Sequence, residues 1–162
     1  MGRAVCPVLH MPIISINERL PTPAKADATL TLSLEGRQKS RQRVTLECGE
    51  EMALTLPRGT CLRDGDQLRA EDGSVITVRA APEPVTTART DDPTLLARAA
   101  YHLGNRHVAL EIGEGFVCYL EDHVLDAMVE ALGLHIVRER RPFEPETGAY
   151  AGHGHEAPHE HG

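Results

Sequence analysis

Histidine is the residue type through which this chain could do chemistry. Eight of its nine histidines lie in residues 81–162, and four of these fall within the last ten residues, HGHEAPHEHG. Neutral imidazole readily binds nickel, copper and zinc, and the two glutamates of this segment add oxygen donors. The segment is therefore predicted to chelate a divalent metal, with a solvated tail or an expression tag as the alternative. Its histidines form two pairs spaced two residues apart: His153 with His155, and His159 with His161.

A fifth histidine, His107, occurs inside the stretch YHLGNRHVALEI, residues 101–112. The pattern predicts a helix that ends at Gly104-Asn105 and a strand, HVALEI, that begins at His107. A ligand could approach His107 on the face that it shares with a small and an acidic residue, although a plain surface histidine is the alternative. The core face of this strand would carry Val108, Leu110 and Ile112, and the other face His107, Ala109 and Glu111.

One imidazole cannot hold a metal ion with useful affinity, so a ligand role for His107 requires a second donor. The simplest second donor is the same histidine of another copy, related by a two-fold axis. The sequence therefore predicts a homodimer through the C-terminal domain, with the metal at the interface.

Two other histidines are weaker metal candidates. His102 borders the apolar stripe of its helix, which favours a packed or hydrogen-bonded role over a ligand role. His123 lies at the start of a second helix, beside Glu121 and Asp122. These carboxylates either cap the helix or form a secondary metal site with His123. His10 and His135 have no clustered donors near them.

The elements that would position these histidines fall into two groups. The first half reads as short strands of period two separated by turn residues, which predicts a small β-barrel or sandwich. The prolines of APEPV, residues 81–85, predict a hinge between two domains. The strands expected before this hinge are TLTLSL ending at Leu34, RVTLE at 43–47, MALTL at 52–56, QLRA at 67–70 and VITVRA at 75–80.

The second half has the order β-α-β-β-α-β, which predicts a ferredoxin-like fold and makes the chain an α+β protein. The first helix would open at Asp91 or Asp92 with Pro93 in its first turn, and the second at Asp122. Their apolar faces would be Leu95, Leu96, Ala99 and Leu103, and Val124, Leu125, Met128, Ala131 and Leu132. We expect the domains to span residues 1–82 and 83–145, followed by a disordered His-rich tail, 146–162.

Composition excludes several classes of function. The formal net charge is −7, and the second half holds 14 acidic against 6 basic side chains, which argues against nucleic acid as a partner. No apolar run is long enough for a membrane span, and four widely spaced cysteines predict reduced thiols in the cytoplasm. No catalytic motif is present, so transfer of a metal ion is favoured over an enzyme activity.

YHLGNRHVALEI, EDHVLDAMVEALGL (121–134), PFEPETGAY (142–150) and the His-rich end together resemble the UreE family of urease accessory proteins, which are nickel metallochaperones. The resemblance covers essentially the whole chain. It implies an N-terminal domain that engages peptides or partners, and nickel held between two C-terminal domains by His107 of each subunit. It also implies that His153 and His155 complete the shell and that His123 matches a peripheral site.

By the same resemblance, the receiver of nickel is the GTP-binding urease accessory protein UreG, which acts with the apo-urease assembly complex. Ala109 and Glu111 stand where many members have Pro and Gln. Two other functions stay open from the residues alone: a nickel or zinc buffer without a client, and a peptide-binding adaptor. The histidines do not choose among Ni(II), Zn(II) and Cu(II).

Overall fold

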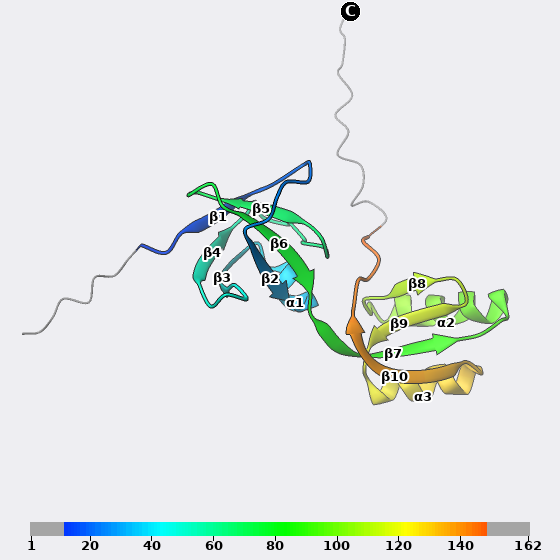
Figure 1. Cartoon of the computed structure of the whole chain (residues 1–162). Coiled ribbons are helices and arrows are strands. Elements are labelled where there is room, and N and C mark those ends of the chain that lie inside the picture. Colours follow the sequence, from blue (N-terminus) through cyan, green and yellow to red (C-terminus); the bar gives the residue numbers. More distant parts are fainter. Residues whose placement is uncertain (1–11, 149–162) are drawn as a thin grey trace, which may run out of the picture. The chain divides into compact units, whose positions relative to one another are not determined.

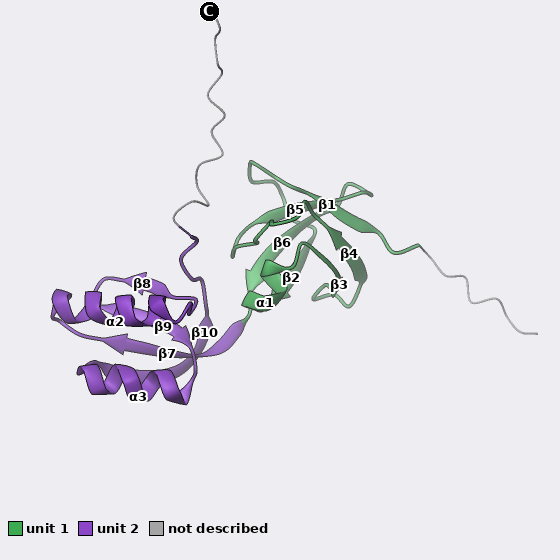
Figure 2. Ribbon diagram, turned by 180° about the vertical axis from the view of Figure 1, so that it is seen from behind, with its two compact units in different colours: residues 1–81 green, residues 82–162 purple. Residues whose placement is uncertain are grey.

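The computed structural model describes residues 12–148. The chain divides into two compact units, residues 1–81 and 82–162 (Figure 2). The predictions that concern His10 and the four tail histidines fall on residues outside the described range.

The N-terminal unit is a six-stranded sheet that closes almost into a barrel. Its strands lie in the order β2-β6-β5-β1-β4-β3. The two edges approach each other, because the Glu47 amide just after β3 donates to the Thr29 carbonyl of β2 at 2.9 Å. This confirms the predicted small β-barrel. The elements are β1 Ser15–Arg19, β2 Ala28–Leu32, α1 Leu34–Gln38, β3 Arg41–Thr45, β4 Glu51–Thr55, β5 Gln67–Ala70 and β6 Val75–Ala80.

Two features of this unit were not predicted. The alternation of apolar and polar residues in β1 is too short to predict a strand. This strand pairs in parallel with β4. The strand expected to end at Leu34 ends at Leu32, because the Ser33 hydroxyl accepts a hydrogen bond from the Gly36 amide at 3.2 Å and starts α1. The alternating apolar residues of the strands form one buried core, which includes Ile16, Leu30, Met52, Leu54, Leu68 and Ile76.

The C-terminal unit has the predicted ferredoxin-like topology. Its sheet has the order β10-β7-β9-β8 with every neighbouring pair antiparallel. Both helices pack on one face of this sheet (Figure 1). The elements are β7 Pro82–Arg89, α2 Pro93–Asn105, β8 Glu111–Gly113, β9 Phe116–Leu120, α3 His123–Leu132 and β10 His135–Pro142.

The ends of both helices follow from side-chain caps. Asp92 accepts hydrogen bonds from the amides of Thr94 and Leu95 at the start of α2. Asp122 does the same for Val124 and Leu125 at the start of α3. Gly133 ends α3 with a φ of 105°, a conformation that costs glycine little.

The apolar faces agree with the prediction for α2 and differ in part for α3. Ala99 and Leu103 are buried, and Leu95 and Leu96 pack against the same core. On α3, Val124 is 52% exposed and Ala131 is exposed, so these two predictions were wrong. The buried face instead runs through Leu125 and Val129, four residues apart.

The proline-rich stretch 81–85 is mostly part of a strand. β7 begins at Pro82 and pairs with β10 along its whole length, whereas its pairing with β9 begins only at Val85. Pro82 and Pro84 therefore lie where β7 has a single neighbour, and there a missing amide donor is tolerated.

Gly113 is required for packing in β8. A Cβ atom at this position would overlap the ring of Phe116, which Arg89 and Arg141 flank at 5.2 and 5.9 Å. We expect Gly113→Ala to lower the free energy of unfolding by about 1–3 kcal/mol, measured by urea denaturation. Gly104→Ala is the control, because nothing lies within 4 Å of its Cβ position in α2. The control should be neutral or slightly stabilising, and equal losses in both variants would contradict the argument.

Among residues 12–148, no helix is both long and apolar enough to cross a membrane.

Candidate metal-binding surface of the C-terminal unit

His107 ends α2 in the left-handed conformation. Its φ is 57°, the one positive φ found at a non-glycine residue within the described chain. The His107 amide donates to the Gly104 carbonyl at 3.0 Å, and the Val108 amide donates to the Leu103 carbonyl at 3.3 Å. These two bonds define a Schellman motif, in which the left-handed position usually belongs to glycine.

The predicted strand beginning at His107 was therefore wrong. Residues 106 and 107 form a turn, and β8 starts only at Glu111. The physical reason is that the helix continues through Gly104 and Asn105, so the reversal that ends it falls on His107. A left-handed conformation costs a residue with a Cβ atom about 1–2 kcal/mol. Strained backbone positions of this kind cluster at functional sites.

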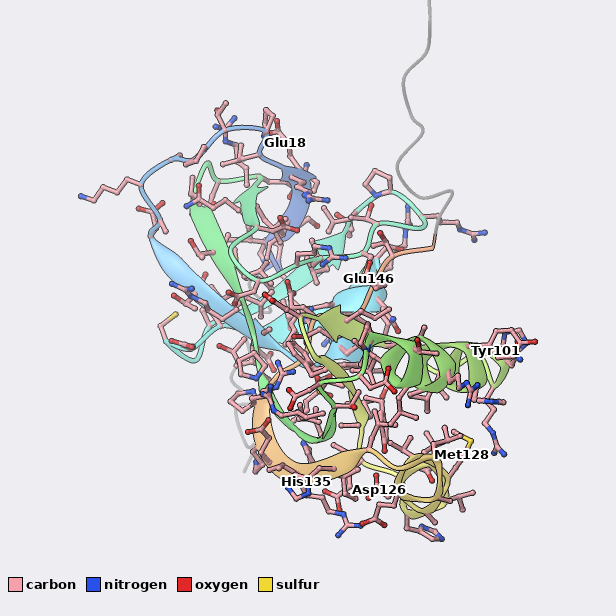
Figure 3. All side chains as sticks on the ribbon, turned by 90° about the vertical axis from the view of Figure 1, so that its right-hand side faces the viewer. Glu18, Tyr101, Asp126, Met128, His135 and Glu146 are labelled. Atoms are coloured by element: carbon pink, nitrogen blue, oxygen red, sulfur yellow. The ribbon has the colours of Figure 1, made fainter. Side chains whose placement is uncertain are left out.

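The surface around this turn is exposed and partly apolar. His107 and Ala109 are exposed, Tyr101 is 65% exposed and Ile112 is 47% exposed. Figure 3 shows Tyr101 projecting outward from α2. His107 is thus accessible to a partner or to an ion, and large apolar side chains in the same stretch, 101–112, are also uncovered.

His102 lies in the last turn of α2 and is exposed, so the packed role favoured from its sequence position was wrong. Its ring makes an edge contact with Tyr101, with ring centroids 5.4 Å apart. His107 follows two residues after the helix. The helix end therefore presents two exposed imidazoles.

His123 is the first residue of α3 and is exposed. The two carboxylates beside it already have other partners. Asp122 caps the helix, and Glu121 lies 4.0 Å from the guanidinium of Arg138. Asp122 therefore caps the helix, which was one of the two roles expected for these carboxylates.

Within the part of the chain that the structure describes, no group of three or more His, Cys, Asp or Glu side chains converges on one point. His107 is therefore a single exposed imidazole in one chain. Any complete ligand shell must draw donors from another copy of the chain or from residues outside 12–148.

The sheet face opposite the helices carries a partly buried charged network. Arg141 of β10 donates to both carboxylate oxygens of Glu111 in β8, at 3.0 and 3.3 Å. Thr87 of β7 donates to Glu139 at 2.8 Å. Cys118 is fully buried here, and burial is the main cause that raises the pKa of its thiol, which keeps it protonated and unsuited to binding metal.

Family models match both units of the chain. The model described as the UreE urease accessory protein N-terminal domain matches residues 13–81. The model described as the C-terminal domain of the same protein matches residues 83–162. The chain belongs to the UreE family.

Similar proteins from several bacteria bear the name urease accessory protein UreE. The protein from Alkalilimnicola ehrlichii is 59% identical over 140 residues, which cover 86% of each chain. That from Citrobacter koseri is 49% identical over 152 residues, 92% of this chain and all of the relative. That from Proteus mirabilis is 50% identical over 133 residues, 82% of this chain and 83% of the relative.

The structure brings together charged residues that the sequence patterns did not single out. Arg141 and Glu139 were seen only as charges on a strand, and Glu111 only as a neighbour of His107. The one available signal was the placement of three acidic or basic residues on the same side of two strands at opposite edges of the sheet. That placement becomes visible only once the topology is known.

Proposed function

We propose that this UreE-family chain is a metallochaperone that captures Ni(II) and delivers it for maturation of the urease active site. The observation that carries the proposal is the exposed His107 held in the left-handed position of a Schellman turn, since glycine could make the same backbone bonds without strain and only the imidazole distinguishes histidine there. Membership of a family of urease accessory proteins supports urease as the enzyme that receives the metal. As an accessory protein, the chain assists the enzyme and is not itself one.

The tight site would form between two copies of the C-terminal unit. A two-fold axis near His107 would supply two imidazoles from one kind of surface. The exposed Tyr101 and Ile112 in the same stretch are apolar groups that a dimer would cover. This arrangement supports the homodimer predicted from the sequence, with nickel at its interface.

The length of chain after Glu146 would allow the first tail histidines to reach this site. The Glu146 amide donates to the Leu110 carbonyl at 2.8 Å, three residues from His107. His153 is the seventh residue after Glu146, which corresponds to an extended span of at most about 25 Å. His153 and His155 are accordingly proposed as additional ligands of the interface site.

The remaining histidines would add capacity at lower affinity. This group comprises His102 and His123, which are exposed, and His159 and His161 farther along the tail. Zn(II) and Cu(II) would also bind in vitro, because the affinities of imidazole sites follow the general order of divalent metals, and this order does not exclude zinc or copper. In the cytoplasm, selection would depend on metal supply and on the partner that receives the ion.

Handover follows from ligand exchange. An ion held by exposed imidazoles can gain a ligand from another protein before it loses one of its own. The proposed receiver is the GTPase UreG, acting with the apo-urease assembly complex. Partner contacts would involve the N-terminal unit as well.

The test combines nickel titration with delivery. Calorimetric titration, with the mass followed by light scattering, should give one tight nickel ion per two chains. Apo-urease mixed with its assembly proteins should then become active faster with the nickel-loaded protein than with the same nickel in free form. If the loaded protein only slows activation, the chain is a nickel or zinc buffer. If nickel binds weakly and activation still depends on the N-terminal unit, it is a peptide-binding adaptor.

A further inference from the structure

The outer face of β3 carries two arginines that have no ion-pair partner among residues 12–148. Arg41 and Arg43 are both exposed, and neither guanidinium contacts a described carboxylate. Three other arginines of the N-terminal unit each contact one: Arg19 contacts Asp66, Arg69 contacts Glu18, and Arg79 contacts Asp64. Arg41 and Arg43 therefore leave a local positive charge on a chain whose net charge is −7.

The residues opposite these arginines on β4 are small and uncharged. Arg41 pairs with Thr55, and Arg43 pairs with Ala53. Glu51, the one acidic residue in the sequence of β4, forms no ion pair with Arg43 in the described chain. An opposite charge directly across the ladder would stabilise the sheet, and neither arginine has one. The two guanidinium groups thus add no ion pair to the fold and remain available to a partner.

β3 is also an edge of the N-terminal sheet, with β4 as its neighbour (Figure 1). The Ala53 amide donates to the Ile14 carbonyl at 3.0 Å, away from β3, so Ala53 and Arg43 are not a hydrogen-bonded pair. In an antiparallel ladder, the backbone N–H and C=O groups of such a residue point away from the partner strand, and those of alternate residues do the same. Arg41, Arg43 and Thr45 therefore direct their backbone groups toward the free edge.

We propose that the edge of β3 from Arg41 to Thr45 binds an extended acidic segment of a partner protein as an added strand. The Glu47 amide already donates to the Thr29 carbonyl, so the free edge ends there. Backbone hydrogen bonds would give affinity, and carboxylates two residues apart would lie opposite Arg41 and Arg43. The inference assigns a surface and a chemistry to partner contacts of the N-terminal unit, and it does not depend on nickel binding.

Charge and spacing favour an acidic peptide over other occupants of this edge. A second copy of β3 would bring arginines close to arginines, and like charges across a ladder are destabilising. Nucleic acid is held by several cations along its backbone, and a chain of net charge −7 repels polyphosphate. Alternate residues of a strand are about 7 Å apart, so acidic residues at every second position of an added strand match the spacing of the two arginines.

Titration of the full chain with a synthetic peptide, followed by NMR, tests the proposal. The probe is the capped heptapeptide Thr-Glu-Thr-Glu-Thr-Glu-Thr, which carries a carboxylate at every second residue. At saturation, the amides of Arg41, Arg43 and Thr45 should exchange with solvent at least about threefold more slowly. The amides of Gln42 and Val44, which face β4, should change little. Protection confined to other parts of the chain would overturn the proposal.

Paired variants test the role of the two arginines. Arg41→Gln combined with Arg43→Gln should weaken binding of the probe about three- to tenfold and leave the midpoint of urea denaturation unchanged. Arg69→Gln combined with Arg79→Gln removes the same charge from two other strands of the unit and should not weaken binding. An equal loss in both double variants would mean that only net charge matters, which contradicts the proposal. Arg43→Gln alone serves if the first double variant does not fold.

A second peptide and two further probes separate the occupants. Glu-Thr-Thr-Glu-Thr-Thr-Glu has the same composition but places successive carboxylates on opposite faces of a strand, so it should bind at least about threefold more weakly. Equal binding of the two peptides would show attraction without register. An oligothymidylate that competes equally well would assign the edge to polyphosphate. Amide protection without peptide that is lost on dilution would assign it to a second copy. Each of these three results overturns the proposal.

Discussion

Replacing His107 with glycine should abolish tight nickel binding and leave the fold as stable as before or more stable. Glycine adopts a φ of 57° without the cost that a Cβ atom imposes, and it keeps both backbone hydrogen bonds of the Schellman motif. The free energy of unfolding should therefore be unchanged or higher by about 1 kcal/mol. Nickel affinity should fall more than about 100-fold, since loss even of groups that only support a ligand costs up to that much.

His107→Ala is the informative comparison for this prediction. Alanine also removes the imidazole but retains the left-handed strain, so its nickel affinity should match that of the glycine variant. Its stability should be lower than that of the glycine variant by about 1 kcal/mol. Calorimetric titration gives the affinity, and urea denaturation gives the stability.

The contrary outcomes are distinct. If both variants keep the tight site, His107 is not a ligand, and the tail holds the metal alone. If His107→Gly loses nickel only because the fold is lost, its unfolding free energy will have fallen, contrary to the expected gain.

Local patterns were sufficient for much of the C-terminal fold. Asp92, Asp122 and Gly133 act within a few residues of the helix ends that they define, so their effect could be predicted from spacing. The ferredoxin-like order followed from the alternation of strand and helix patterns. In the N-terminal unit, the same reasoning correctly placed β5 and β6 to the residue.

The conformation of His107 could not be predicted in this way. Gly104-Asn105 offered the expected stop, but the hydrogen bonds that end the helix form two residues later, where Val108 can pack with Leu103 against the core. Tertiary packing thus decided where the left-handed residue falls. The hydrogen bond from the Glu144 amide to the Glu111 carboxylate spans 33 residues and depends on the sheet order, so no local signal could reveal it.

A second large effect is expected at Asp126, which joins three elements of the C-terminal unit. Its carboxylate accepts from the Tyr119 hydroxyl of β9 at 2.9 Å and from Arg138 Nε of β10 at 2.8 Å. Asp126 is 1% exposed on α3, and Figure 3 shows it on this helix. Asp126→Ala leaves the buried Tyr119 hydroxyl without its partner and removes a charged acceptor, so we expect a loss of about 2–4 kcal/mol in unfolding free energy. Glu130→Ala, an exposed change one turn later, should stay within about 0.5 kcal/mol.

Acid should remove this contribution of Asp126. Burial raises the pKa of Asp126, but hydrogen bonds from its neighbours, Arg138 and Tyr119 among them, lower it further than burial raises it, to below the ordinary 3.8. A carboxyl whose pKa is lower in the folded state stabilises the fold above its unfolded pKa and loses that effect as the pH falls through its folded pKa. The stability difference between the unchanged protein and Asp126→Asn should therefore be constant near neutral pH and shrink below about pH 4. Urea denaturation across this range measures it. A difference that grows on acidification would mean that Asp126 is held protonated in the fold, and its bond to Arg138 would then contribute no ion pair.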